Sequence, residues 1–141
     1  MSDMEKLIQG LNEDLAAEWG TIMRYTYQSA KSFGVVGAEI REMLEREIPD
    51  EMGHARYLTD VIVDLDGEPT TEPAKFDKPS GIREMLELDL KKENQDVENY
   101  RHHAELADEI GHIELKVKLE EIASDEQRHA REINPYKKDY K

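Results

Sequence analysis

The sequence repeats itself after 75 residues. Residues 14–18 (DLAAE) return as residues 89–93 (DLKKE), and residues 50–56 (DEMGHAR) return as residues 125–131 (DEQRHAR). The 33-residue interval between Glu18 and Glu51 also recurs between Glu93 and Glu126. A chain built this way folds into two similar units, so the repeat predicts a pseudo-symmetric molecule in which each half supplies half of any shared site.

Each unit reads as a pair of α-helices. Apolar residues recur at steps of three and four, and the alternation of a β-strand is nowhere sustained. These stripes predict helices over residues 4–33, 36–65, 82–107 and 115–133, with a capping box at Ser2 and Glu5. Pro49 conflicts with the second helix, but the apolar stripe keeps its phase through the proline, so we expect one kinked helix.

The lengths of the connections predict the topology. Short links around residues 34–37 and Gly111 make each pair of helices an antiparallel hairpin. Residues 67–79 contain Pro69, Pro73 and Pro79 and are long enough to run the length of a bundle. We therefore expect an all-α, antiparallel four-helix bundle of two hairpins joined by one long crossover. It forms one domain over residues 1–134, and Pro135 ends the fourth helix before a polar tail, 135–141.

Each of the four stripes carries a glutamate at a position that the helical period assigns to the core. A buried carboxylate is costly without a positive partner, so four of them indicate bound cations. A histidine follows the glutamate by three residues in the second and fourth helices, which directs both side chains toward one centre. The predicted ligands are Glu18, Glu51, His54, Glu93, Glu126 and His129.

Four carboxylates and two imidazoles suit a pair of Fe or Mn ions, or less productively Zn. The chain contains no Cys, which excludes disulfides, thiolate catalysis and iron–sulfur clusters. Glutamates from two helices and Glu-x-x-His motifs from the other two form the di-iron or di-manganese arrangement of helical bundles. A di-iron pair can deliver two electrons together to O₂ or H₂O₂.

The charge of the chain excludes several partners. With 33 acidic and 19 basic residues, its net charge of −14 disfavours nucleic acid and anionic membranes. No apolar run is long enough to span a membrane, and the N-terminus does not resemble a signal peptide. We therefore expect a cytoplasmic protein, whose acidic field either attracts cations or simply keeps it soluble.

Several other residues have two interpretations at this stage. Tyr25 and Tyr100 either hydrogen-bond the site carboxylates or serve as ordinary core residues. Asp50 and Asp125 either hold the histidine rings from behind the metals or are solvated. Because His102 and His103 are adjacent, we expect them at the surface, and we interpret the further Glu-x-x-His motif at Glu109 as accidental.

The sequence resembles the bacterioferritins between about Leu11 and His129. The likeness rests on Leu11-Asn12, on the predicted ligands and on the DEMxH motif of residues 50–54. It implies a ferritin-like fold and a ferroxidase centre with Glu18 and Glu93 terminal, Glu51 and Glu126 bridging, and one histidine on each metal. It also implies a role for Met52 as a haem b ligand at a two-fold subunit contact, against an ordinary interface or core methionine.

The resemblance implies oxidation of Fe(II) and iron storage or detoxification in a homo-oligomer. Only 12 residues follow His129, so we expect no fifth helix like the one that lines the four-fold axis of bacterioferritin cages. One alternative is a rubrerythrin-like, dimeric di-iron or di-manganese peroxidase that takes electrons from an external donor. Another is a non-catalytic metal-binding or interaction protein. Particle size and Fe(II) oxidation distinguish the three.

Overall fold

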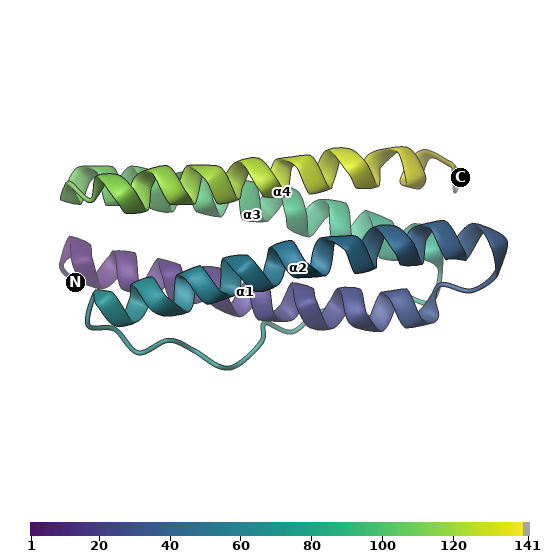
Figure 1. Ribbon diagram of the computed structural model, residues 1–141, viewed down its shortest axis with the longest axis horizontal. Coiled ribbons are helices and arrows are strands. Elements are labelled where there is room, and N and C mark those ends of the chain that lie inside the picture. Colours follow the sequence, from purple (N-terminus) through teal and green to yellow (C-terminus); the bar gives the residue numbers. More distant parts are fainter. Residues whose placement is uncertain (140–141) are drawn as a thin grey trace.

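The computed structural model describes residues 1–139. It contains four long helices, α1 (Asp3–Lys31), α2 (Gly34–Asp64), α3 (Ile82–Ile110) and α4 (Ile113–Asp139), and no strand among these residues. Figure 1 shows two antiparallel hairpins, α1–α2 and α3–α4, lying one on the other. The predicted all-α, antiparallel four-helix fold is confirmed.

The ends of the helices follow local chemistry. Ser2 caps α1, since its hydroxyl accepts a hydrogen bond from the Glu5 backbone N–H. Gly111 ends α3 in the left-handed conformation (φ 91°), where its N–H bonds back to the Ala107 carbonyl. The link between α1 and α2 is only Ser32 and Phe33, so the prediction of a link around residues 34–37 was wrong. Gly34 begins α2 with φ 78°, which glycine adopts without strain.

Pro49 and Pro135 both lie inside helices. α2 is one helix through Pro49, as predicted, whereas α4 continues through Pro135 to Asp139, so the prediction that Pro135 ends it was wrong. A helical proline frees one carbonyl, four residues earlier. Pro49 and Pro135 are exposed, so water can hydrate that carbonyl.

The crossover, residues 65–81, runs along the outside of the α1–α2 hairpin (Figure 1). Four hydrogen bonds hold it against α1, and two of them involve the Asn12 side chain, which donates to the Glu68 carbonyl and accepts from the Thr70 N–H. Ala74 N–H bonds to the Ala16 carbonyl at 2.8 Å, and the Trp19 indole donates to the Thr70 carbonyl at 3.1 Å. A Cβ on Gly20 would come within 2.7 Å of the Ala74 carbonyl oxygen, so this close approach requires glycine.

The hydrophobic core forms two separate clusters. One includes Leu11, Leu15 and Leu58, and the other includes Leu44 and Leu86. Along every helix the predicted glutamate falls between a residue of one cluster and a residue of the other. A polar layer therefore crosses the middle of the bundle. Phe33 and Val36, which we counted in the apolar stripes, are exposed at the α1–α2 turn.

Candidate metal centre

The polar layer brings all six predicted ligands together. Each of the six is 6% exposed or less, although all are ionisable. They form two groups, within each of which the ligand atoms lie no more than 4.8 Å apart. The first is Glu18, Glu51, His54 and Glu126, and the second is Glu51, Glu93, Glu126 and His129. Since Glu51 and Glu126 belong to both groups, they lie where carboxylates bridge two metals.

Both histidines direct Nδ1 into the centre. His54 Nδ1 lies 3.2 Å from a Glu126 oxygen, and His129 Nδ1 lies 2.9 Å from a Glu51 oxygen. Neither Nδ1 has a hydrogen-bond partner among the described residues. Each imidazole therefore offers a nitrogen to the centre, on the side where a metal ligand must be deprotonated.

The opposite ring nitrogens are held by carboxylates from the facing helix. His54 Nε2 lies 2.9 Å from Asp125, and His129 Nε2 lies 3.2 Å from Asp50. A carboxylate at this nitrogen favours the tautomer with the proton on Nε2 and leaves Nδ1 free. Of the two interpretations of Asp50 and Asp125, the geometry favours holding the rings.

The two tyrosines also reach across the bundle. Tyr100 donates to Glu18 at 2.6 Å, and Tyr25 donates to Glu93. Both tyrosines are completely enclosed, or nearly so, and the helical repeat relates them. Each terminal glutamate thus receives a hydrogen bond from the tyrosine of the other half.

Many oxygens of the centre still lack a partner. Both carboxylate oxygens of Glu51 and of Glu126, and one of Glu18 and of Glu93, are buried without a hydrogen bond. Such atoms are expensive to bury unless something positive satisfies them. Two divalent cations would do so, and the donor set of oxygen and nitrogen suits iron or manganese.

Without metal, the centre must hold protons instead. Burial, with the adjacent Glu18 charge, raises the pKa of Glu51 to about 7. Burial also raises the pKa of Glu126 well above its usual range. For His54, burial lowers the pKa, but the nearby carboxylates of Glu18, Glu51 and Asp125 together outweigh burial and raise it to about 9. Metal binding would therefore displace protons from this cluster.

Sequence reasoning missed Glu47. This carboxylate is 3% exposed and lies 2.6 Å from His129 Nε2, so His129 has two carboxylates where His54 has one. Glu47 stands one turn before Glu51, on the same side of α2. Its core position was detectable from that spacing, but the neighbouring Ile48 already filled the apolar stripe.

Two buried pairs of polar side chains between α1 and α3 were also missed. His103 was expected at the surface, but it is 7% exposed and lies 2.6 Å from Asp14. Arg24 pairs with Asp89 at 2.8 Å. The repeat aligns Asp14 with Asp89, so two equivalent carboxylates were visible in the sequence. Their partners differ in type and position, and for that reason the repeat did not reveal them.

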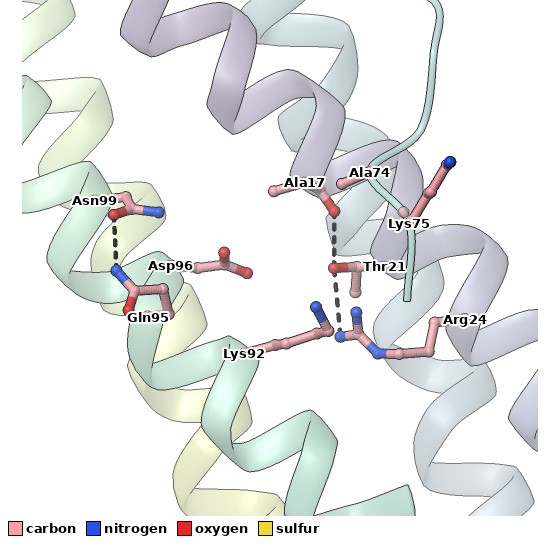
Figure 2. A pocket seen from close by; sticks show the side chains of 10 residues that line it. Ala17, Thr21, Arg24, Ala74, Lys75, Lys92, Gln95, Asp96 and Asn99 are labelled. Carbon is pink, nitrogen blue, oxygen red and sulfur yellow. Dashed lines mark hydrogen bonds between the residues drawn. The ribbon is translucent and has the colours of Figure 1, made fainter. Parts of the chain in front are cut away.

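A pocket of about 180 Å³ lies between α1 and α3, with Ala74 and Lys75 of the crossover on its rim (Figure 2). Its other lining residues form four pairs related by the repeat: Ala17 and Lys92, Gly20 and Gln95, Thr21 and Asp96, and Arg24 and Asn99. The Asp96 carboxylate points into this space and is 8% exposed. Burial and the nearby Glu93 charge raise its pKa well above the usual value. None of the six predicted ligands lines the pocket, but Asp96 stands one helical turn after Glu93.

A four-helix bundle with Glu and Glu-x-x-His ligands at its middle defines the class of di-metal carboxylate proteins. Comparison with known proteins agrees: the family model described as a ferritin-like domain matches residues 8–140. The chain belongs to the ferritin-like family, and the predicted ferritin-like fold is confirmed.

Curated relatives are bacterioferritins. That of Brucella melitensis is 29% identical over 134 residues, covering 92% of this chain and 81% of the relative. That of Rhodobacter capsulatus is 30% identical over 129 residues, covering 88% and 78%. The predicted resemblance to bacterioferritins is therefore confirmed.

Solved structures extend the comparison to shape. A ferritin-like, diiron-carboxylate protein from Bacillus anthracis superposes with a TM-score of 0.93 at 39% identity, covering 96% of this chain and 98% of that one. The bacterioferritin of Rhodobacter capsulatus, described with a metal-free dinuclear site and a haem iron, superposes with a TM-score of 0.85 at 28% identity. The match covers 93% of this chain and 82% of that one.

Two further observations concern Met52, the residue that the resemblance suggested as a haem ligand, and the expected absence of a membrane span. Met52 lies on α2 between ligands Glu51 and His54, yet its own side chain faces outward and is 46% exposed. No helix within residues 1–139 is long and apolar enough to cross a membrane.

Proposed function

We propose that this protein binds two Fe(II) ions at the centre and oxidises them with O₂ or H₂O₂, in the manner of a bacterioferritin that stores or detoxifies iron. The observation that carries the proposal is the pair of overlapping ligand groups, which share Glu51 and Glu126. Manganese would fit the same donors.

An iron pair supplies one electron from each Fe(II), so together they reduce O₂ to H₂O₂, or H₂O₂ to two molecules of water, with two protons taken up. The chain's part is to hold the ions. Glu18 and Glu93 are terminal ligands, each receiving a tyrosine hydrogen bond. Glu51 and Glu126, which belong to both ligand groups, would be shared by the two ions, and His54 and His129 would each offer Nδ1 to one of them.

The pocket between α1 and α3 is our proposed route for Fe(II) and oxidant. Its lining residues Ala17 and Lys92 are the sequence neighbours of Glu18 and Glu93, and Asp96 offers a carboxylate inside it. Asp96 stands one turn after Glu93, so an ion on Asp96 is near its next ligand.

A haem b group between two copies of the chain is a separate part of the proposal. The exposed thioether of Met52 is a suitable iron ligand, and the relative from Rhodobacter capsulatus is described with a haem iron. A visible spectrum of protein purified from haem-supplied cells tests this, with Met52→Ala as the variant that loses the haem bands.

Fe(II) oxidation followed by absorbance, under O₂ and then under H₂O₂, tests the main proposal. Glu51→Ala should abolish the rapid phase, and Glu109→Ala, an exposed change of the same type, should keep it. Equal rates in both variants would contradict the proposal. Particle size then separates a storage shell from the rubrerythrin-like dimer, which we place second because the relatives are bacterioferritins.

A further inference from the structure

Arg128 stands where the repeat places Gly53 in the first half. Residues 50–54 read DEMGH and residues 125–129 read DEQRH, so the arginine has no counterpart. The guanidinium lies between the two carboxylates that hold the histidine rings. Its Nη2 is 2.8 Å from Asp50 and 3.8 Å from Asp125. A single arginine thus contacts a carboxylate from each half of the centre, on the α2–α4 face.

The same face carries more negative charge than the histidines require. Glu47 and Asp50 oxygens lie with His129 Nε2 in a third group no more than 4.8 Å across. Glu47 is almost fully buried, and its Oε1 has no hydrogen-bond partner among the described residues. Arg128 connects Asp50 of this group to Asp125, and the three carboxylates together are oxygen donors of the kind that a divalent cation prefers.

We propose that Arg128 is a tethered cation that occupies this carboxylate cluster and excludes a third metal ion from the α2–α4 face of the centre. The cluster is defined as Glu47, Asp50 and Asp125. This inference rests on the proposed function, because it takes the binding of two ions at the centre as given.

The chemistry of arginine suits this role. A guanidinium stays charged at any physiological pH and has donors but no acceptor, so it cannot itself become a metal ligand. It satisfies Asp50 through a charge-assisted hydrogen bond. A divalent ion at the same place would have to displace this bond and then remain beside a fixed positive charge. The two carboxylates are thereby reserved for His54 and His129.

The test counts metal ions per chain. Wild-type protein is dialysed against Co(II) without oxygen and analysed for bound metal, with Arg128→Gln and Arg131→Gln in parallel. Arg131 is an exposed arginine one turn along α4 that pairs with none of the three cluster carboxylates among the described residues. Its replacement therefore makes the same change in net charge while the Arg128–Asp50 pair stays in place. We expect two ions per chain in wild type and in Arg131→Gln, and three in Arg128→Gln.

Two further variants identify the site. Arg128→Lys, which keeps a positive charge, should bind two ions. Arg128→Gln combined with Asp50→Asn should return from three ions to two, because the third ion loses a ligand. Circular dichroism confirms that each variant is folded.

The outcomes separate the two proposals. Fewer than two ions in wild type would overturn the proposed function. Two ions in wild type and still two in folded Arg128→Gln would overturn the inference alone, as would a third ion appearing equally in Arg131→Gln. Three ions in Arg128→Lys would overturn the claim that positive charge excludes the metal.

Discussion

The two halves of the metal centre agree in their ligands and differ in what surrounds them. The repeat preserves two glutamates, the histidine and the tyrosine in both halves. Around the histidines the symmetry ends. His54 Nε2 has one carboxylate, Asp125, whereas His129 Nε2 has both Glu47 and Asp50. The positions related to Glu47 and Arg128 hold Ile122 and Gly53.

This difference separates two kinds of constraint. Atoms that bind the metals must occupy equivalent places in both halves, because two similar ions need similar donors. The groups behind them set ring orientation and local charge, and these tasks can be met in more than one way. Two ions in matching ligand shells would therefore have different surroundings, with Glu47 and the Arg128–Asp50 pair behind His129 and Asp125 behind His54.

The largest expected effect comes from removing a bridging ligand, where the halves should behave alike. Glu51→Ala and Glu126→Ala each delete an oxygen donor from both ligand groups. Metal affinity should fall more than about 100-fold at both ions, beyond the effect of losing an outer partner. Isothermal titration with Co(II) measures this. If only one ion were lost in either variant, that glutamate would not bridge.

The second prediction concerns stability without metal. The raised pKa values of Glu51 (about 7) and His54 (about 9) mean that the folded protein holds protons which the unfolded chain releases. The free energy of unfolding should therefore fall as pH rises, through the Glu51 window from 4.5 to 7 and the His54 window from 6.5 to 9. The shifted pKa of Glu51 alone accounts for on the order of 3 kcal/mol of this fall in the free energy of unfolding.

Urea denaturation of chelator-treated protein at pH 5, 7 and 9 measures this slope. Glu51→Gln should flatten the part below pH 7 and leave the part above it. A metal-free protein whose stability rises with pH over this range would contradict the proton-holding cluster.

The third prediction is a smaller loss of metal affinity that should differ between the two halves. Asp125→Asn removes the one carboxylate that residues 1–139 place at His54 Nε2, and metal affinity in that half should fall by about 10- to 100-fold. Asp50→Asn should cost less, because Glu47 still holds His129 Nε2. Co(II) spectra recorded during titration compare the two variants. Equal losses would mean that Glu47 does not support the ring.

The smallest expected effect is a loss of stability that should be equal in the two halves. Tyr25→Phe and Tyr100→Phe each remove one hydrogen bond to a terminal glutamate, so each should lower the free energy of unfolding by about 1–2 kcal/mol. Thermal and urea unfolding of both variants test this. A large effect in one variant alone would show that the tyrosines are not equivalent.

Much of the fold was predictable because it depends on periodicity and composition. The apolar stripes located four helices, and the short links with one long connection identified their order. The errors fell at Phe33, Gly34 and Pro135, where a turn or an exposed carbonyl decides the outcome. Whether water can reach the carbonyl that a proline frees depends on the side of the helix it faces, which local sequence does not specify.

The ligand positions that the structure brings together could be predicted because the repeat gave two independent copies of one pattern. Glu47, His103 and Arg128 occur in one copy only, so the same reasoning passed over them. His103 is buried through a partner on another helix, Asp14, 89 residues away. A contact of that kind becomes visible only when the helices are assembled.

The crossover, residues 65–81, also influences how the two hairpins associate to form the centre. Each hairpin holds half of the donors, so neither alone can bind a metal pair. A linker of this length keeps the hairpins at millimolar effective concentration, and its attachment to α1 at Ala16 and Trp19 restricts the orientations they explore. A chain cleaved between residues 67 and 79 would have to assemble the centre by collision in solution, and iron loading would then depend on protein concentration.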